Sequence, residues 1–161
     1  MKKLVLMLML LAPMTMMAQK FGKVNSQTIM QALPDVAKAN GELEALQKQK
    51  DNELKAMQDE LNRKLDEYQK GQSTMNATAK QQKETELQGL NQKIQQAYQD
   101  GQQELQKKSN ELMQPIVAKV RAAIDAVGKA GNYTYIFEEG AAIYTGSNVV
   151  DVTKEVQSKI K

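Results

Sequence analysis

Two adjacent carboxylates, Glu138 and Glu139, are the residues best placed for acid–base chemistry, because this chain of 161 residues contains no His and no Cys. Paired carboxylates can act as general acid and base, but only where their surroundings shift their pKa values. These two lie beside Gly140 at a predicted turn with no implied cleft, so we expect them to be solvated. Without a thiol, an imidazole or a soft metal ligand, we predict no enzyme activity, no catalytic or metal-binding residue and no cofactor.

The N-terminal segment has the pattern of a secretory signal peptide. Lys2 and Lys3 precede an apolar run from Leu4 to Ala12 and a candidate cleavage site, which predicts a signal peptide over residues 1–18 cleaved after about Ala18. The apolar run is shorter than the roughly 20 residues of a membrane-spanning helix, although an uncleaved anchor is the alternative.

Removal of the signal peptide would leave a nearly neutral protein. The whole chain has 22 Lys and Arg and 19 Asp and Glu, and the loss of two Lys lowers the net charge from +3 to +1. Phosphate binding depends on net cationic contacts, so we predict no nucleic-acid partner.

Residues 35–113 carry an eleven-residue apolar repeat with few helix breakers. The spacing of three, four and four residues is typical of helices that pair nearly straight or with a slight right-handed supercoil. Polar turn formers interrupt the repeat at "GQSTMNATAK", residues 71–80. We therefore predict an antiparallel helical hairpin, an arm with its turn at about 71–80. The repeat is set by the following residues: Leu43, Leu46, Leu54, Met57, Leu61, Leu65 and Tyr68, then Leu87, Leu90, Ile94, Tyr98, Gly101, Leu105, Ser109, Leu112, Ile116, Val120, Ala123 and Val127.

Three positions in the arm suggest flexing points. Lys50 and Gly101 replace apolar residues of the repeat and are expected to lie close across the helix pair, and Gly costs about 1 kcal/mol relative to Ala inside a helix. Pro115 removes a backbone donor and is expected to kink the second helix where the arm meets the body. A hinge at Lys50 and Gly101 is one interpretation, and ordinary sequence drift in a tolerant coiled coil is the other.

The tip of the arm carries Lys70, Lys80 and Lys83 with no acidic residue between Glu67 and Glu84. These lysines could contact an anionic partner or a membrane surface weakly, or could only keep the turn soluble, since exposed charges are screened within about 10 Å. Met75 could contact a partner or pack between the helix ends.

Residues 19–34 and 114–161 are predicted to form a small β-rich body. Phe21 to Val24 is a predicted strand, followed by a helical turn that ends before Pro34. Tyr133 to Glu138 and Ala141 to Tyr144 are predicted to form an aromatic hairpin, and Asp151 is a predicted N-cap for a final helix to Ile160.

An isolated hairpin is marginal in water, and so few short elements make a poor core for one chain. We therefore predict that the hairpin builds a sheet shared between subunits, while a small self-sufficient body is the alternative. The candidate oligomerisation residues are Phe21, Val24, Tyr133, Tyr135, Ile136, Phe137, Ile143 and Tyr144.

The two ends and the hairpin give the sequence a specific resemblance. With "FGKVNSQTIMQALPD", "YTYIFEEGAAIYT" and "VVDVTKEVQSKI", the chain resembles the Skp (OmpH) family of periplasmic chaperones for outer-membrane proteins over essentially all of its mature length. The resemblance implies an α+β fold, a homotrimer whose strands form a central β-barrel, and helical arms around a cavity that holds unfolded outer-membrane β-barrel proteins. The sequence departs from the family pattern at Lys23 and Asn25, and the low net charge of the mature chain differs from that of the strongly basic relatives.

These observations favour a periplasmic holdase that prevents aggregation of its clients without ATP, since the sequence has no Walker-type loop. The alternative is a non-enzymatic coiled-coil spacer or tether of the cell envelope, which would bind one fixed epitope and protect no unfolded chain.

Overall fold

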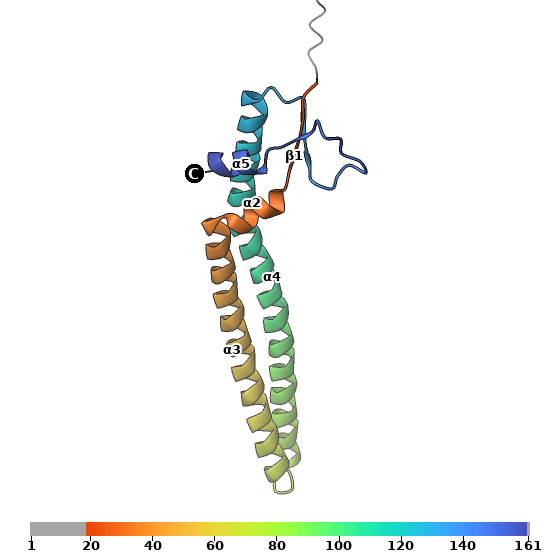
Figure 1. Ribbon diagram of the computed structural model, residues 1–161. Coiled ribbons are helices and arrows are strands. Elements are labelled where there is room, and N and C mark those ends of the chain that lie inside the picture. Colours follow the sequence, from red (N-terminus) through yellow and green to blue (C-terminus); the bar gives the residue numbers. More distant parts are fainter. Residues whose placement is uncertain (1–18, 161) are drawn as a thin grey trace, which may run out of the picture. The chain divides into compact units, whose positions relative to one another are not determined.

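The computed structural model describes residues 19–160, so the predicted signal peptide lies outside the described residues. These residues fall into two compact units. The first, which we call the sheet unit, is made of the residues up to Ser26 together with those from Ala122 on. The second is Gln27–Arg121. The elements are β1 (Phe21–Val24), α2 (Ser26–Ala32), α3 (Pro34–Gly71), α4 (Ala77–Ala130), β2 (Tyr135–Glu138), β3 (Val150–Asp151) and α5 (Thr153–Lys159) (Figure 1).

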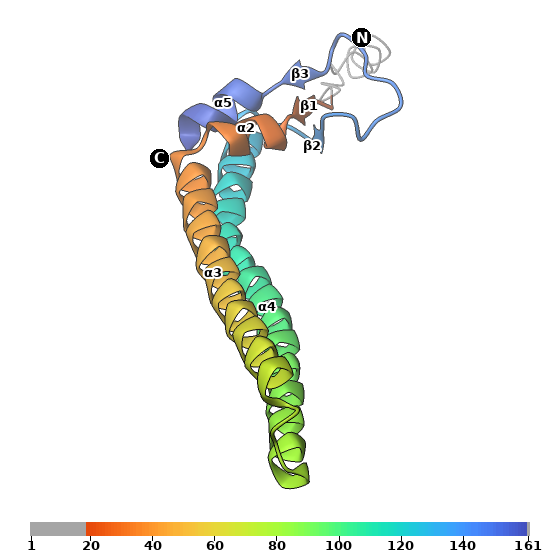
Figure 2. The ribbon, with the colours of Figure 1, turned by 90° about the horizontal axis from the view of Figure 1, so that it is seen from below.

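Helices α3 and α4 form the predicted antiparallel hairpin, because local sequence signals define where each begins. Pro34 occupies the first turn of α3, where its missing N–H costs nothing. The side chain of Asn76 accepts a hydrogen bond from the N–H of Ala79 at 2.9 Å and so caps α4. Both views show the two helices side by side (Figures 1 and 2). The turn between them is shorter than predicted and lies between Gly71 and Ala77.

The eleven-residue repeat forms the seam between α3 and α4. Leu61 and Leu87 are buried, and most other residues of the repeat are half-buried. Tyr98 is an exception, since 56% of its surface is exposed although the repeat assigns it to the seam. The neighbouring Ala97 is half-buried, so the smaller residue is the less exposed of the two. An ion pair between Lys119 and Asp35 at 2.8 Å joins the two helices, so the helix pair extends past Pro115.

The sheet has three parallel strands in the order β2-β1-β3 (Figure 2). Phe21 lies opposite Tyr135 and Lys23 opposite Phe137, while β3 pairs with β1 through Gly22 and Lys23. The predicted strand Phe21–Val24 is confirmed, and together with the helical hairpin it confirms the predicted α+β fold class.

The predicted aromatic hairpin is wrong in its second strand. Residues 141–144 form no strand, and β2 pairs with β1 instead of with the chain that follows it. Gly140 has φ +85° and the N–H of Ala141 donates to the Glu138 carbonyl, which are features of a type II turn. That turn splays the flanking chain, and residues 139–149 form a crossover because a tight hairpin cannot join parallel strands.

The final helix begins later than predicted. Its N-cap position is Val152, and Asp151 belongs to β3. The Asp151 carboxylate nevertheless accepts a hydrogen bond from the N–H of Thr153 at 2.9 Å. Asp151 therefore satisfies one of the free backbone N–H groups at the start of α5, although it lies one residue before the N-cap. Helix α5 ends at Lys159 and not, as predicted, at Ile160.

Candidate functional site

An aromatic cluster covers one face of the sheet. Because alternate residues of a strand share a face, the register places Phe21, Tyr135 and Phe137 together. Their ring centroids are 5.7 to 6.4 Å apart and the rings are within 25° of parallel. Tyr135 is 59% and Phe137 is 45% exposed. The sheet unit therefore presents a preformed aromatic surface, made of three of the candidate oligomerisation residues.

Three further candidate residues lie elsewhere on the sheet unit and are less exposed. Val24 is buried, and Tyr133 and Ile136 are half-buried. Gly22 leaves the space that these two side chains fill, because a Cβ built on Gly22 would lie only 3.1 Å from the Tyr133 ring. The Lys20 ammonium lies 4.1 Å from the centre of the same ring. Val24, Tyr133 and Ile136 thus contribute to the sheet unit itself.

The last two candidates, Ile143 and Tyr144, lie in the loop that follows β2 and are the most exposed large apolar residues described. The side chain of Tyr144 also lines a cavity of about 280 Å³ beside Phe21 and Phe137. The loop therefore adds apolar surface next to the aromatic cluster, although it forms no strand.

Glu138 and Glu139, expected to be solvated, make specific contacts. Glu138 accepts a hydrogen bond from the N–H of Ser26 at 2.9 Å and so satisfies a donor at the beginning of α2. Glu139 forms an ion pair with Lys23 at 2.6 Å and accepts a hydrogen bond from the Asn25 side chain at 2.8 Å. The two carboxylates connect the end of β2 to the segment that follows β1, which is a structural role.

These contacts shift the protonation equilibria of the sheet unit. The hydrogen bond from Lys23, then that from Asn25, lowers the pKa of Glu139, and the same contact with Glu139 raises the pKa of Lys23. Hydrogen bonds from Thr153 lower the pKa of Asp151. Glu139 and Asp151 are therefore both stabilised in their charged forms. Charged carboxylates suit a structural ion-pair network, whereas a general acid must carry a proton.

Lys50 and Gly101 lie across from each other in the helix pair. A Cβ built on Gly101 would be 3.7 Å from the Lys50 side chain, and the Lys50 ammonium pairs with Glu104 at 2.8 Å and with Glu53 at 3.4 Å. The hydrogen bond to Glu104 raises the pKa of Lys50. The Lys50 stem fills the space that Gly101 leaves, while flexing at this point stays a prediction.

The tip of the arm has fewer free cations than its sequence suggested. Lys70 pairs with Asp66 at 2.5 Å and Lys83 pairs with Glu86 at 3.0 Å, whereas Lys80 makes no ion pair within residues 19–160. The Met75 methyl lies against Gly71, since a Cβ there would come within 2.8 Å of it. Contact of the tip with a partner or a membrane stays a prediction.

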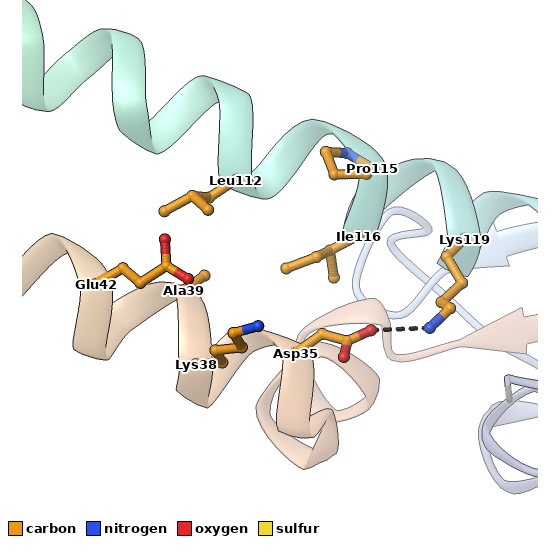
Figure 3. Close-up of a pocket in the computed structure, with 8 residues that line it drawn as sticks. All are labelled: Asp35, Lys38, Ala39, Glu42, Leu112, Pro115, Ile116 and Lys119. Atoms are coloured by element: carbon orange, nitrogen blue, oxygen red, sulfur yellow. Dashed lines mark hydrogen bonds and ion pairs between the residues drawn. The ribbon is translucent and has the colours of Figure 1, made fainter.

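A cleft of about 280 Å³ lies between α3 and α4 around Pro115 (Figure 3). Figure 3 shows Pro115 and Ile116 of α4 above Ala39 of α3, and the ion pair between Asp35 and Lys119 at the end of the cleft. The hydrogen bond from Lys119 lowers the pKa of Asp35. Helix α4 continues through Pro115, and a kink there stays a prediction.

No group of three or more Asp and Glu residues could hold a metal ion anywhere in residues 19–160. Among the helices described, none combines the length and the apolar composition needed to cross a bilayer. Every buried side-chain nitrogen or oxygen of the described residues has a hydrogen-bond partner.

Sequence reasoning missed the polar network of Asn25, Glu138, Glu139 and Thr153. Thr153 accepts a hydrogen bond from the N–H of Asn25 at 2.9 Å, across 128 positions of sequence. Only the acidic pair after an aromatic strand could have indicated the network, and that pattern alone does not identify its partners.

Together, the helical hairpin and the three-stranded sheet define an α+β protein with an exposed aromatic cluster on its sheet. Residues 20–160 match the family described as outer membrane protein (OmpH-like), and the chain belongs to that family.

Two relatives share the length of the chain, and a solved structure shares its fold. A protein named Chaperone protein Skp from Pectobacterium atrosepticum is 26% identical over 144 residues, which cover 89% of this chain and 87% of the relative. A protein of the same name from Yersinia enterocolitica is 26% identical over 154 residues, covering 96% and 93%. A crystal structure described as an OmpH-like outer membrane chaperone, from Caulobacter crescentus CB15, has a TM-score of 0.77 at 15% identity and covers 88% of this chain and 83% of that one.

Proposed function

We propose that this protein is a periplasmic chaperone that holds unfolded outer-membrane β-barrel proteins and prevents their aggregation without ATP. The observation that carries the proposal is family membership over residues 20–160, with chaperone relatives of nearly the same length. The lowered pKa values of Glu139 and Asp151 agree with it, since they fit structural rather than catalytic carboxylates.

We propose further that the working form is a homotrimer with a shared sheet, in which the body is formed by residues 19–34 and 114–161 and the arms by 35–113. Exposed Tyr135 and Phe137, the exposed loop residues Ile143 and Tyr144, and the open outer edge of β2 support such an assembly. Export through a signal peptide cleaved after about Ala18 belongs to the same proposal.

The test is the native mass of the mature chain, measured alone and after mixing with a urea-unfolded outer-membrane β-barrel protein diluted into buffer. We expect a trimer that forms a soluble complex of three chains with one client. A trimer that leaves the client to precipitate would contradict the chaperone proposal while keeping the assembly. A monomer that keeps the client soluble would contradict the trimer alone.

A further inference from the structure

Two grooves on the arm are copies of each other along the eleven-residue repeat. One has a volume of about 580 Å³ and the other of about 430 Å³. On α3, the smaller groove is lined by Leu43, Glu44 and Gln47. The residues eleven positions later, Leu54, Lys55 and Gln58, line the larger groove.

The same relation holds on α4. The larger groove is lined by Ile94, Gln95 and Tyr98, and the residues eleven positions later, Leu105, Gln106 and Ser109, line the smaller groove. Eleven residues make almost three full turns, so both grooves lie on one flank of the helix pair, about 16 Å apart. We call this flank, lined by Gln47, Gln58, Gln95, Gln99, Gln102 and Gln106, the amide flank.

The opposite flank of the seam carries the cross-helix ion pairs. Glu42 and Gln47 are about 140° apart around α3, and Gln106 and Lys108 are about 160° apart around α4, with seam residues between them. Lys108 pairs with Glu42 at 3.5 Å. The other cross-helix pairs are Lys50 with Glu104, Lys64 with Glu86, and Lys119 with Asp35.

The ion-pair flank is therefore charged, and its hollow of about 320 Å³ is lined by Leu46, Glu104, Lys107, Lys108 and Glu111. The amide flank instead carries exposed apolar side chains beside its Gln amides. Tyr98 is 56% exposed and lines the larger groove. Val117 is 51% exposed and lies eleven residues after Gln106, at the same position of the repeat. Lys55, the one charged residue of the larger groove, is already paired with Asp59 at 2.9 Å.

We propose that the amide flank is the surface of the arm that binds unfolded client, and that its occupant is an extended, uncharged polypeptide segment containing apolar or aromatic side chains. The inference rests on the proposed chaperone function. The polarity of the surface favours this occupant, because the grooves offer apolar carbon and Gln amides, and Glu44 is their one charged residue without an ion pair among the described residues. A Gln amide both donates and accepts hydrogen bonds, which matches the N–H and C=O groups of an extended main chain. About five extended residues span the distance between the two grooves, so one segment can engage both.

Tyr98→Ser and the double variant Gln95→Glu with Gln106→Glu test the amide flank. Ser is the residue at the equivalent position of the next repeat, and Glu has nearly the helix propensity of Gln, so the arm should fold. The matched control is Gln92→Glu with Gln103→Glu, on the same helix, with the same spacing and charge change, at exposed positions outside both grooves.

The measurement is the affinity of wild-type protein, the amide-flank variants and the control for a urea-unfolded outer-membrane β-barrel protein diluted into buffer. The amide-flank variants should bind about three- to tenfold more weakly, with the control unchanged. If wild-type protein binds the client and the amide-flank variants match the control, the inference is overturned while the proposed function stands. A wild-type protein that leaves the client to precipitate overturns both.

A second measurement uses the absence of Cys from the chain. Gln95→Cys and Gln92→Cys are each labelled with a polarity-sensitive fluorophore, and the client should shift the emission at position 95 to shorter wavelength but leave position 92 unchanged. A shift at 95 that appears with protein concentration alone, or with phospholipid vesicles but not with client, would assign the flank to another copy or to a membrane and overturn the inference.

Discussion

Side-chain contacts around the sheet join residues 111 to 128 positions apart, whereas those of the helix pair repeat along the chain every eleven residues. In the sheet unit, Gly22 contacts Tyr133 and Glu139 pairs with Lys23, each across more than 100 positions of sequence. In the arm, Lys50 lies opposite Gly101 at positions where the repeat would place apolar residues. The comparison indicates that the sheet unit depends on specific fit and the arm on the average of many similar contacts.

The largest expected effect comes from a charge in the core of the sheet unit. Val156 of α5 is fully buried, and Val156→Asp should lower the free energy of unfolding by about 3 kcal/mol or more, because a buried carboxylate without a partner loses its solvation. Urea unfolding followed by near-ultraviolet circular dichroism measures the loss.

Val117→Asp on α4, in the unit Gln27–Arg121, is the counterpart, since Val117 is 51% exposed and its substitution should change stability by less than about 0.5 kcal/mol. Equal losses at the two positions would contradict the contrast between the two regions.

Replacing a glycine by alanine should lower the free energy of unfolding in the sheet unit and raise it in the arm. Gly22→Ala should destabilise by about 1–3 kcal/mol, since the new Cβ lies 3.1 Å from the Tyr133 ring and 3.3 Å from Ile136. Gly101→Ala should stabilise by about 1 kcal/mol, because its Cβ meets Lys50 at an ordinary contact distance of 3.7 Å and Ala favours a helix.

Thermal unfolding of both variants beside wild type measures these shifts. A Gly101→Ala protein less stable than wild type would show that the close approach of Lys50 is specific, and would remove the distinction drawn between arm and sheet.

The smallest effect is the dependence on acid. The folded-state pKa of Glu139 is lowered below its ordinary value of 4.5, chiefly by the hydrogen bond from Lys23, so its stabilisation is present above pH 4.5 and is lost as the pH falls through the lowered pKa. Lys64, then Lys83, lowers the pKa of Glu86 in the arm in the same way.

Glu139 is exposed and Glu86 is half-buried, with 41% and 38% of their side chains accessible, so the losses should be modest and smaller in high salt. Glu139→Gln should flatten the acid dependence of the near-ultraviolet signal from the aromatic cluster, and Glu86→Gln that of the helical signal. If Glu139→Gln altered the helical signal instead, the assignment of each carboxylate to its own region would be wrong.

Much of the fold followed from local sequence signals. The eleven-residue repeat predicted α3 and α4, and Pro34 predicted the boundary between α2 and α3. The strand Phe21–Val24 was also predicted, because its residue types favour extended backbone whatever their partner is. The roles proposed for the aromatic, arm-tip and hinge residues stay predictions.

What failed depended on contacts distant in sequence. The aromatic pattern at residues 133–144 predicted a hairpin, but β1 pairs with β2 and Gly140 turns the chain away. Tyr98 belonged to the seam by its spacing, yet it is 56% exposed while Ala97 before it is half-buried. Glu138 and Glu139 are exposed, as expected, but the sequence did not identify their partners near β1.

The sequence by itself determined the two long helices and the lack of His and Cys side chains, because helix periodicity acts over a few residues. Only the tertiary structure decided the parallel order β2-β1-β3, the stacking of Phe21 on Tyr135 and the difference between the two flanks of the arm. Strand pairing joins segments more than 100 residues apart, and many pairings satisfy the same backbone donors and acceptors, so the side chains that fit together in space select one of them.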